Sequence, residues 1–166
     1  MTLQDAQIHE LEMMARHEEA VGELYTAYAD KFPKHKDFWT RLAGEEKGHA
    51  AWIRKLFPKA EEGVIIFDDT RFNVKAIDTS LMYIEHWIRE ARSEPIELVK
   101  GLSIALDIEN SLIEKDYFKV YGTDDAEMRK VFDALAQGTR EHRVRIRSLL
   151  DEVRQTGGQD ADVAIG

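Results

Sequence analysis

Four long stretches of the chain repeat apolar residues in alternating steps of three and four, the spacing of one face of an α-helix. They cover about residues 3–31, 36–57, 95–121 and 124–156 of the 166-residue chain. Helices with one apolar face are stable in water only when these faces pack together. The sequence therefore predicts an all-α bundle of four long helices.

The links between the four stretches predict how they are connected. The first two are separated only by a short turn at Pro33, so we expect an antiparallel hairpin. Residues 59–73 look partly extended, and an amphipathic helix over about 74–91 follows them. Hairpin, long crossover and second hairpin make up the ferritin-like connectivity. A five-helix fold, with the 74–91 segment as a full member, is the alternative.

Local signals predict where the helices begin and end. Pro58 should end the second helix, because proline disrupts a helix interior. Ser93 and Pro95 should cap and open the third helix, and Gly122 should end it. Thr123 or Asp124 should then cap the fourth. We expect one domain over residues 1–156 and a flexible tail over 157–166.

Composition excludes several classes of function. The chain has no cysteine, so it holds no thiolate metal site and no disulfide. Its formal net charge of −9 argues against nucleic-acid binding and against docking on anionic membranes. No apolar run reaches the roughly 18 residues of a membrane span, and polar residues break every early apolar run. We expect a soluble, cytoplasmic protein.

Polar residues interrupt all four apolar faces near mid-helix. They are Glu18 in the first helix, Glu46 and His49 in the second, Glu109 in the third, and Thr139 and His142 in the fourth. At 1.5 Å of rise per residue, they lie roughly 15–25 Å from the turns of their hairpins. We therefore expect them to converge at one depth in the core if the two hairpins pack in step.

A metal ion is the simplest reason for such a cluster. Buried carboxylates are costly unless they are paired or bind metal, and no lysine or arginine falls on these faces at that level. Glu46 and His49 are three residues apart, so both can reach one ion. Imidazole with carboxylate suits iron, manganese or zinc. The alternative is a metal-free core whose polar groups bond to one another.

Other polar residues carry weaker signals. His9, His17, His35 and His86 are expected at surface or packing positions. Glu19, Glu45 and Glu141 are expected to be solvated beside the proposed ligands, and a small rotation of a helix could bring one of them into the site.

The chain resembles the rubrerythrin-like branch of the ferritin-like superfamily of di-iron carboxylate proteins. The residues that carry this resemblance are Glu18, Tyr25, Thr26, Tyr28 and Ala29, the motif over residues 38–50, Glu109, and Tyr117. Only the motif of the second helix is specific. The resemblance implies that Glu18, Glu46, His49, Glu109 and His142 are metal ligands and that Tyr25 and Tyr117 act beside them.

The resemblance also shows one departure. The family repeats a glutamate–histidine pair on the fourth helix, and Thr139 stands where this glutamate is expected. Four glutamates balance two divalent ions, whereas three leave one positive charge uncompensated in a core of low dielectric. A water-derived hydroxide, Glu114 or Glu141 could compensate this charge; otherwise we expect the second ion to bind weakly or not at all.

Three functions follow from these expectations. The first is an oxidoreductase with one or two iron ions that acts on peroxide, dioxygen or ferrous iron. The second is a metal-binding or storage module without turnover, and the third is a structural bundle that has lost its metal. The chain lacks the cysteine-ligated iron domain of full rubrerythrins, and a homodimer is the expected assembly.

Overall fold

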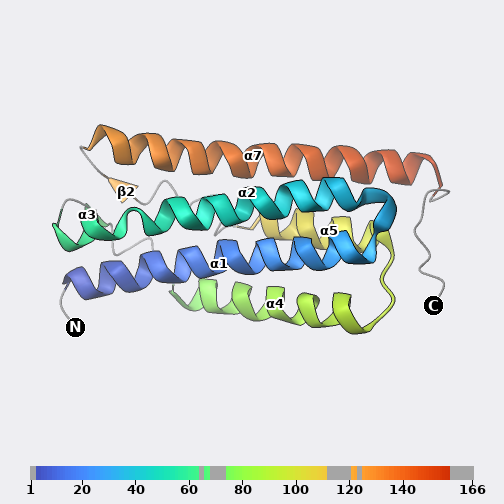
Figure 1. Cartoon of the computed structure of the whole chain (residues 1–166), viewed down its shortest axis with the longest axis horizontal. Coiled ribbons are helices and arrows are strands. Elements are labelled where there is room, and N and C mark those ends of the chain that lie inside the picture. Colours follow the sequence, from blue (N-terminus) through green and yellow to red (C-terminus); the bar gives the residue numbers. More distant parts are fainter. Residues whose placement is uncertain (1–2, 64–65, 68–73, 112–120, 123–124, 158–166) are drawn as a thin grey trace.

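The computed structural model describes residues 3–63, 66–67, 74–111, 121–122 and 125–157 (Figure 1). The described chain is an all-α bundle with a long crossover, as the sequence predicts. The four long helices α1, α2, α5 and α7 surround one core, and the crossover helix α4 lies along α1 (Figure 1). The predicted flexible tail falls almost entirely outside the described residues.

The first hairpin consists of α1 (Leu3–Lys31) and α2 (Lys36–Arg54), joined by the 3-10 turn η1 (Pro33–His35). The prediction that Pro58 ends the second helix is wrong. The helix α2 already stops at Arg54, and a short helix α3 (Phe57–Glu61) begins with Pro58 in its first turn. Proline suits this position because the first turn has no intrahelical acceptor for its missing N–H.

The crossover carries strand β1 (Ile66–Phe67) and helix α4 (Val74–Ser93). Five apolar side chains of α4 are buried: Ile77, Leu81, Ile84, Ile88 and Ala91. A hydrogen bond of 2.8 Å between Nε2 of His17 and Oγ of Ser80 ties α4 to α1. His17 is thus a buried packing residue, and burial lowers its pKa despite the nearby charge of Glu18.

The second hairpin differs from the prediction at its ends. The third helix, α5 (Leu98–Glu109), starts after the extended residue Glu97, and Ser93 belongs to the end of α4. It ends at Glu109, whereas the sequence predicts a continuous helix to about residue 121. Residues 112–120, including Tyr117, lie outside the described part of the chain.

The segment before α7 also departs from the helical prediction. Tyr121–Gly122 forms strand β2, which pairs antiparallel with β1 and so ties the crossover to the start of the fourth helix. The last helix, α7 (Ala126–Gln155), is capped by Asp125, whose side chain accepts a 2.9 Å hydrogen bond from the N–H of Met128. The predicted caps, residues 123 and 124, are not among the described residues.

The apolar core is divided into two clusters along the bundle. One contains Trp39 with the rings of Tyr25 and Tyr28 packed against it, at centroid distances of 5.5 and 4.9 Å. The other surrounds Leu11 and Phe132 near the opposite end. On α1, α2 and α7, the polar residues that interrupt the apolar face lie between residues of the two clusters, and Glu109 lies at the end of α5. Together they form a polar layer across the core, and this layer consists of Glu18, Glu46, His49, Glu109, Thr139 and His142.

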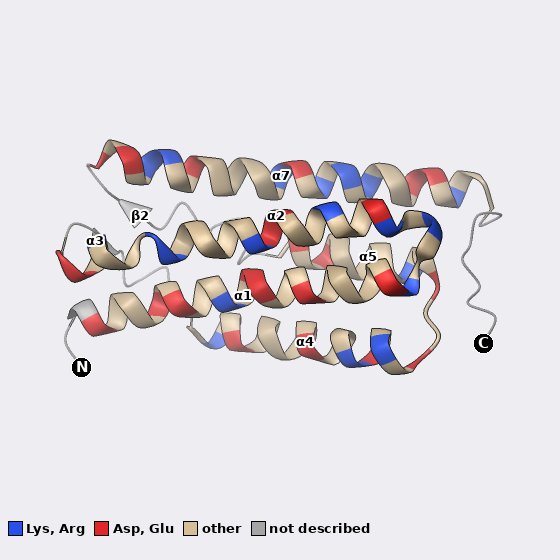
Figure 2. Ribbon diagram, viewed as in Figure 1, with Lys and Arg blue, Asp and Glu red and all other residues tan. Residues whose placement is uncertain are grey.

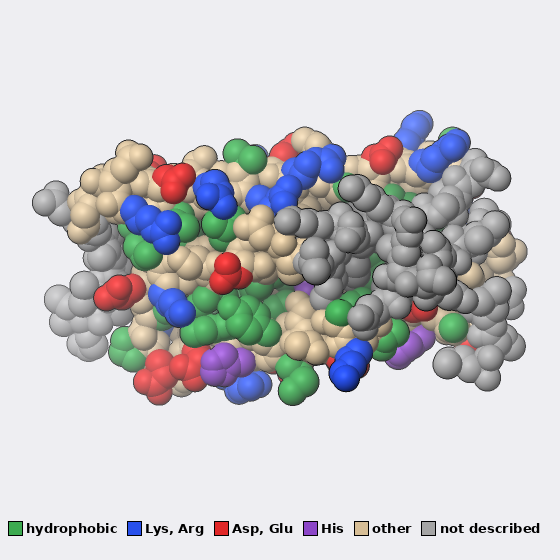
Figure 3. Space-filling model, turned by 180° about the vertical axis from the view of Figure 1, so that it is seen from behind, with side chains coloured by type: hydrophobic (Ala, Val, Ile, Leu, Met, Phe, Trp, Pro, Cys, Tyr) green, Lys and Arg blue, Asp and Glu red, His purple; other side chains and the backbone are tan. Residues whose placement is uncertain are grey.

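The surface mixes both charge signs along every long helix (Figure 2). Seen from behind, charged side chains surround a group of hydrophobic ones (Figure 3). Among the described residues, the exposed large hydrophobic ones are Trp52, Met82, Tyr83 and Val144. In the part of the chain that the structure describes, no helix is both long enough and apolar enough to cross a bilayer.

Candidate metal centre

The polar layer contains every residue of the predicted metal site. The five predicted ligands are at most 5% exposed: Glu18, Glu46, His49, Glu109 and His142. Each comes from the apolar face of its helix, so the same periodicity that forms the core carries it inward. The four helices α1, α2, α5 and α7 therefore all contribute to the layer.

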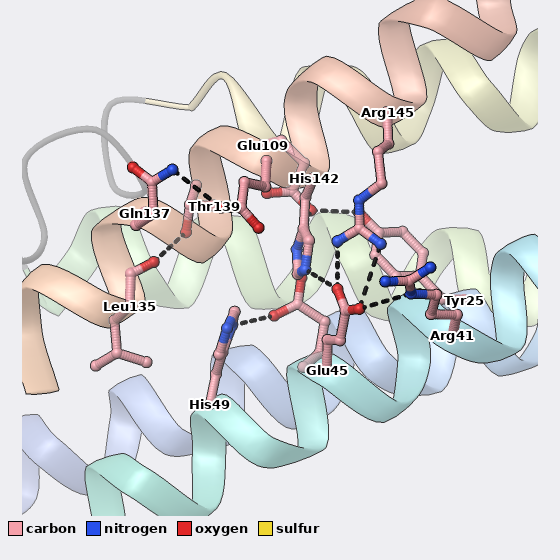
Figure 4. A network of polar contacts seen from close by, with 12 residues as sticks. Tyr25, Arg41, Glu45, His49, Glu109, Leu135, Gln137, Thr139, His142 and Arg145 are labelled. Carbon is pink, nitrogen blue, oxygen red and sulfur yellow. Dashed lines mark hydrogen bonds and ion pairs between the residues drawn. The ribbon is translucent and has the colours of Figure 1, made fainter.

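Glu46 is the centre of this arrangement. Its Oε2 lies 2.9 Å from Nδ1 of His49, and its Oε1 lies 2.7 Å from Nδ1 of His142 (Figure 4). Nδ1 of His49 also lies 3.4 Å from Oε2 of Glu18, and Nδ1 of His142 lies 3.4 Å from Oε1 of Glu109. The two halves repeat one pattern, an imidazole between its own glutamate and the shared Glu46.

We call these halves the His49 half-site (Glu18, Glu46, His49) and the His142 half-site (Glu109, Glu46, His142). The two imidazole rings stack with their centroids 5.3 Å apart. The half-sites thus lie side by side on either face of Glu46.

Proton positions in the metal-free layer follow from these contacts. Burial alone would lower the pKa of both histidines, but hydrogen bonds to the surrounding carboxylates outweigh it. The pKa of His49 rises to about 10 and that of His142 to about 11. Burial, followed by the charge of Glu46, raises the pKa of Glu18 to about 7. The layer without metal is therefore held together by imidazolium–carboxylate pairs.

The donor set fits a divalent metal. Glu46, His49 and His142 each offer one donor atom, and these atoms lie within 4.8 Å of one another. Ligand distances near 2.0–2.2 Å place donors roughly 3–4 Å apart, so small side-chain shifts would close the set around an ion. In addition, Oε1 of Glu18 is buried without a hydrogen-bond partner among the described residues. Two imidazoles with carboxylates suit ferrous iron.

Comparison with known families agrees with this chemistry. A family model of rubrerythrin matches residues 10–124, more than half of the chain. The chain belongs to the rubrerythrin family. This ferritin-like family binds metal ions, and the matched segment includes Glu18, Glu46, His49 and Glu109. The match ends before α7, the helix that carries Thr139 and His142. No curated protein and no solved structure matches the chain.

Glu45 is a site residue of this rubrerythrin-family chain that the sequence did not identify. Its side chain is partly solvated, as expected, and its Oε2 also lies 2.9 Å from Nε2 of His142. Arg145 and Arg41 both donate hydrogen bonds to the same carboxylate (Figure 4). Burial would raise the pKa of Glu45, but the bonds to Arg145 and His142 lower it to about 2. Glu45 thus fixes the outer nitrogen of His142 and leaves Nδ1 directed into the layer.

Of the two predicted catalytic tyrosines, one lies beside the layer. The hydroxyl of Tyr25, which is fully buried, donates a 2.7 Å hydrogen bond to Oε1 of Glu109. This contact fixes the carboxylate of the His142 half-site. The other predicted tyrosine, Tyr117, is outside the described residues, and its role stays a prediction.

Thr139 occupies the position where a fourth glutamate was expected, and it adds no charge. Its side chain is buried, and its hydroxyl donates a 3.2 Å hydrogen bond to the carbonyl of Leu135, one turn earlier in α7. The preceding residue, Gly138, lets α7 approach His49 closely. A Cβ atom at position 138 would lie 2.6 Å from Nε2 of His49. This stretch of α7 therefore leaves space for the ring of His49 but supplies no metal ligand beside it.

A cleft between α2 and α7 leads to the layer from outside. It has a volume of about 690 Å³, and His49 and His142 are among the residues that line it. Glu45 on α2 and Arg145 on α7 line the cleft from opposite walls, and Trp52 follows His49 by one helical turn. The cleft gives small molecules a route from solvent to both imidazoles.

Proposed function

We propose that this rubrerythrin-family chain binds iron in its polar layer and acts as an oxidoreductase on dioxygen, peroxide or ferrous iron. The observation that carries the proposal is the repeated geometry around Glu46. Each half-site offers one imidazole and two carboxylates, one of them shared. The layer is buried, and the cleft between α2 and α7 reaches it.

Charge supports one tight and one weak ion. Three carboxylates line the two half-sites, and Thr139 contributes none. The first divalent ion is fully compensated, whereas the second leaves one uncompensated positive charge where electrostatic interactions are strong. We therefore infer one tightly bound ferrous ion per chain and a second that binds only at high concentration.

The residues of the chain have distinct roles in this proposal. A bound iron ion would supply the electrons that reduce an oxidant. Glu45 holds His142 in one orientation, and Tyr25 holds Glu109. Tyr25 is the aromatic hydroxyl that the described structure places against a proposed ligand, so it is suited to deliver a proton or an electron there. The apolar clusters on either side keep bulk water away from the layer.

A metal-free structural bundle is the second candidate, and one observation favours it. The two imidazolium groups already pair with the carboxylate of Glu46 at 2.7 and 2.9 Å, so much of the buried charge is balanced without metal. The unpartnered Oε1 of Glu18 argues against this candidate, because a core selected to be metal-free has no reason to keep a buried acceptor unpaired.

Metal stoichiometry with single-turnover kinetics separates these functions. The chain would be loaded anaerobically with ferrous iron, passed over a desalting column and measured for iron per chain, then mixed with dioxygen or peroxide. We expect about one tightly held iron and oxidation faster than that of free ferrous iron. Bound iron without faster oxidation would indicate a storage module. No retained iron would overturn the proposal and leave the structural bundle.

A further inference from the structure

The cleft between α2 and α7 is much larger than the proposed oxidants need. Its volume of about 690 Å³ lies within the roughly 300–1,000 Å³ typical of sites for small organic molecules. Dioxygen or peroxide occupies little more than the roughly 30 Å³ share of a water molecule. The size of the cleft therefore calls for a ligand class beyond these oxidants.

The outer part of the cleft is apolar on both walls. Trp52 on α2 is 40% exposed and Val144 on α7 is 65% exposed, and both line the cleft with Ala134. Two of the four exposed large hydrophobic residues of the described chain thus face this one cleft. Exposed apolar side chains that gather in a concave site mark a place for an apolar ligand body.

The polar lining favours an anion. Arg41, Arg140 and Arg145 line the cleft against Glu45 and Glu141, although the whole chain has a net charge of −9. A local excess of positive charge in an acidic protein selects for anionic ligands.

Arg140 is the arginine available to such a ligand. Arg41 and Arg145 both donate to the carboxylate of Glu45, which therefore occupies them. Arg140 donates only to the side-chain carbonyl of Gln137, at 3.0 and 3.2 Å, and no carboxylate pairs with it among the described residues. Its planar guanidinium can bind a carboxylate through two hydrogen bonds.

We propose that this cleft binds a small organic carboxylate with an apolar body. The carboxylate pairs with Arg140, the body lies against Trp52 and Val144, and the far end points toward His49 and His142. The proposal rests on the proposed function only for what happens at that far end. Binding itself needs no metal, so the two proposals fail separately.

Calorimetry on the 166-residue chain, without metal, tests the proposal. The probe is 3-phenylpropanoate, and its neutral amide is the matched ligand. We expect the carboxylate to bind at least 10-fold more tightly than the amide. The R140Q variant should reduce carboxylate affinity to the level of the amide, and W52A should weaken both probes about 10-fold. The matched control R147Q changes an exposed arginine of α7 outside the cleft and should stay within twofold.

Three results would overturn the proposal. They are equal affinity for acid and amide, equal effects of R140Q and R147Q, and a self-associated chain whose cleft is closed to the probe. Sedimentation of the same samples detects the last of these. Circular dichroism of the variants checks that they fold, and normal helicity is expected because Trp52 and Arg140 are exposed. Carboxylate binding by a chain that retains no iron would support the cleft proposal while contradicting the proposed function.

Discussion

The substitution Thr139→Glu tests whether a missing carboxylate limits the second ion. A carboxylate here would enter the buried layer from α7, one helical turn before His142. The centroids of the two imidazole rings are 5.3 Å apart, and we take this distance as the separation between the added carboxylate and the second ion. At about 5 Å and an effective dielectric of about 20, one carboxylate gains about 6 kcal/mol from a divalent ion.

Burial of the added carboxylate cancels part of this gain. Burying an ionised group costs several kcal/mol, so we expect a net gain of about 2–3 kcal/mol. This corresponds to about 100-fold tighter binding of the second ion. Without metal, the same carboxylate adds a fourth acid to a buried layer that already holds Glu18, Glu46 and Glu109, so the metal-free T139E chain should be less stable by about 1–3 kcal/mol.

Anaerobic calorimetric titration with ferrous iron, combined with elemental analysis of the desalted protein, measures both affinities. The matched control T139Q has nearly the same shape and no charge, and it should leave the weak second ion unchanged. Two tight ions in T139E and one in T139Q are the expected results. Equal stoichiometry and affinity in the two variants would refute the charge argument.

Three further predictions concern the same layer. Replacing Glu46 with glutamine should abolish tight iron binding, because both half-sites share this residue. The substitution Glu18→Gln should weaken iron binding without abolishing it, because Glu18 belongs to one half-site. Calorimetry compares the iron affinities of the two variants, and equal losses would contradict the shared role of Glu46. Replacing Tyr25 with phenylalanine should lower stability by about 1.5–3 kcal/mol in urea denaturation, since Glu109 loses a hydrogen bond. The control Tyr28→Phe should cost nothing measurable, because the Tyr28 hydroxyl is buried without a partner among the described residues, and similar losses in both variants would refute this. The metal-free chain should lose stability as pH rises from about 6.5 towards 10. In the folded chain the pKa values of His49 and His142 are raised to about 10 and 11. Over this range the folded chain therefore keeps two protons that the unfolded chain has released, so rising pH favours unfolding. Each histidine contributes at most about 1.4 kcal/mol per pH unit, and a midpoint of thermal unfolding that is flat or rises over this range would contradict the imidazolium pairs.

Periodicity predicted the bundle and the layer because it acts on every turn of a helix. Apolar residues at steps of three and four fix which face is buried, so a polar residue on that face is carried inward with it. Rise per residue then fixes its depth. Glu18 and Glu46 come together for this reason, although 28 positions separate them in the sequence. That they bind metal, and that the chain forms a homodimer, stay predictions.

Helix ends and neighbouring polar contacts were harder to predict. The residues Pro58 and Ser93 are each compatible with the end of one helix or the start of the next. The structure places Pro58 at the start of α3 and Ser93 at the end of α4. Glu45 lies next to the buried face, and whether it is solvated depends on a histidine and two arginines whose rotamers no spacing rule specifies. The close approach at Gly138 depends in the same way on the distance between two helices.

The shared carboxylate Glu46 also has a consequence for the order of folding and metal loading. Two imidazolium protons hold the layer together before metal arrives, and together they carry the same charge as one divalent ion. Entry of one divalent ion with release of both protons would therefore be electroneutral, so the net charge buried in the core would not change. A nascent chain can then complete its fold with protons as temporary counter-ions for two of the three buried carboxylates. The cost is competition, because acidification of the surroundings would favour protons over metal with the square of their concentration.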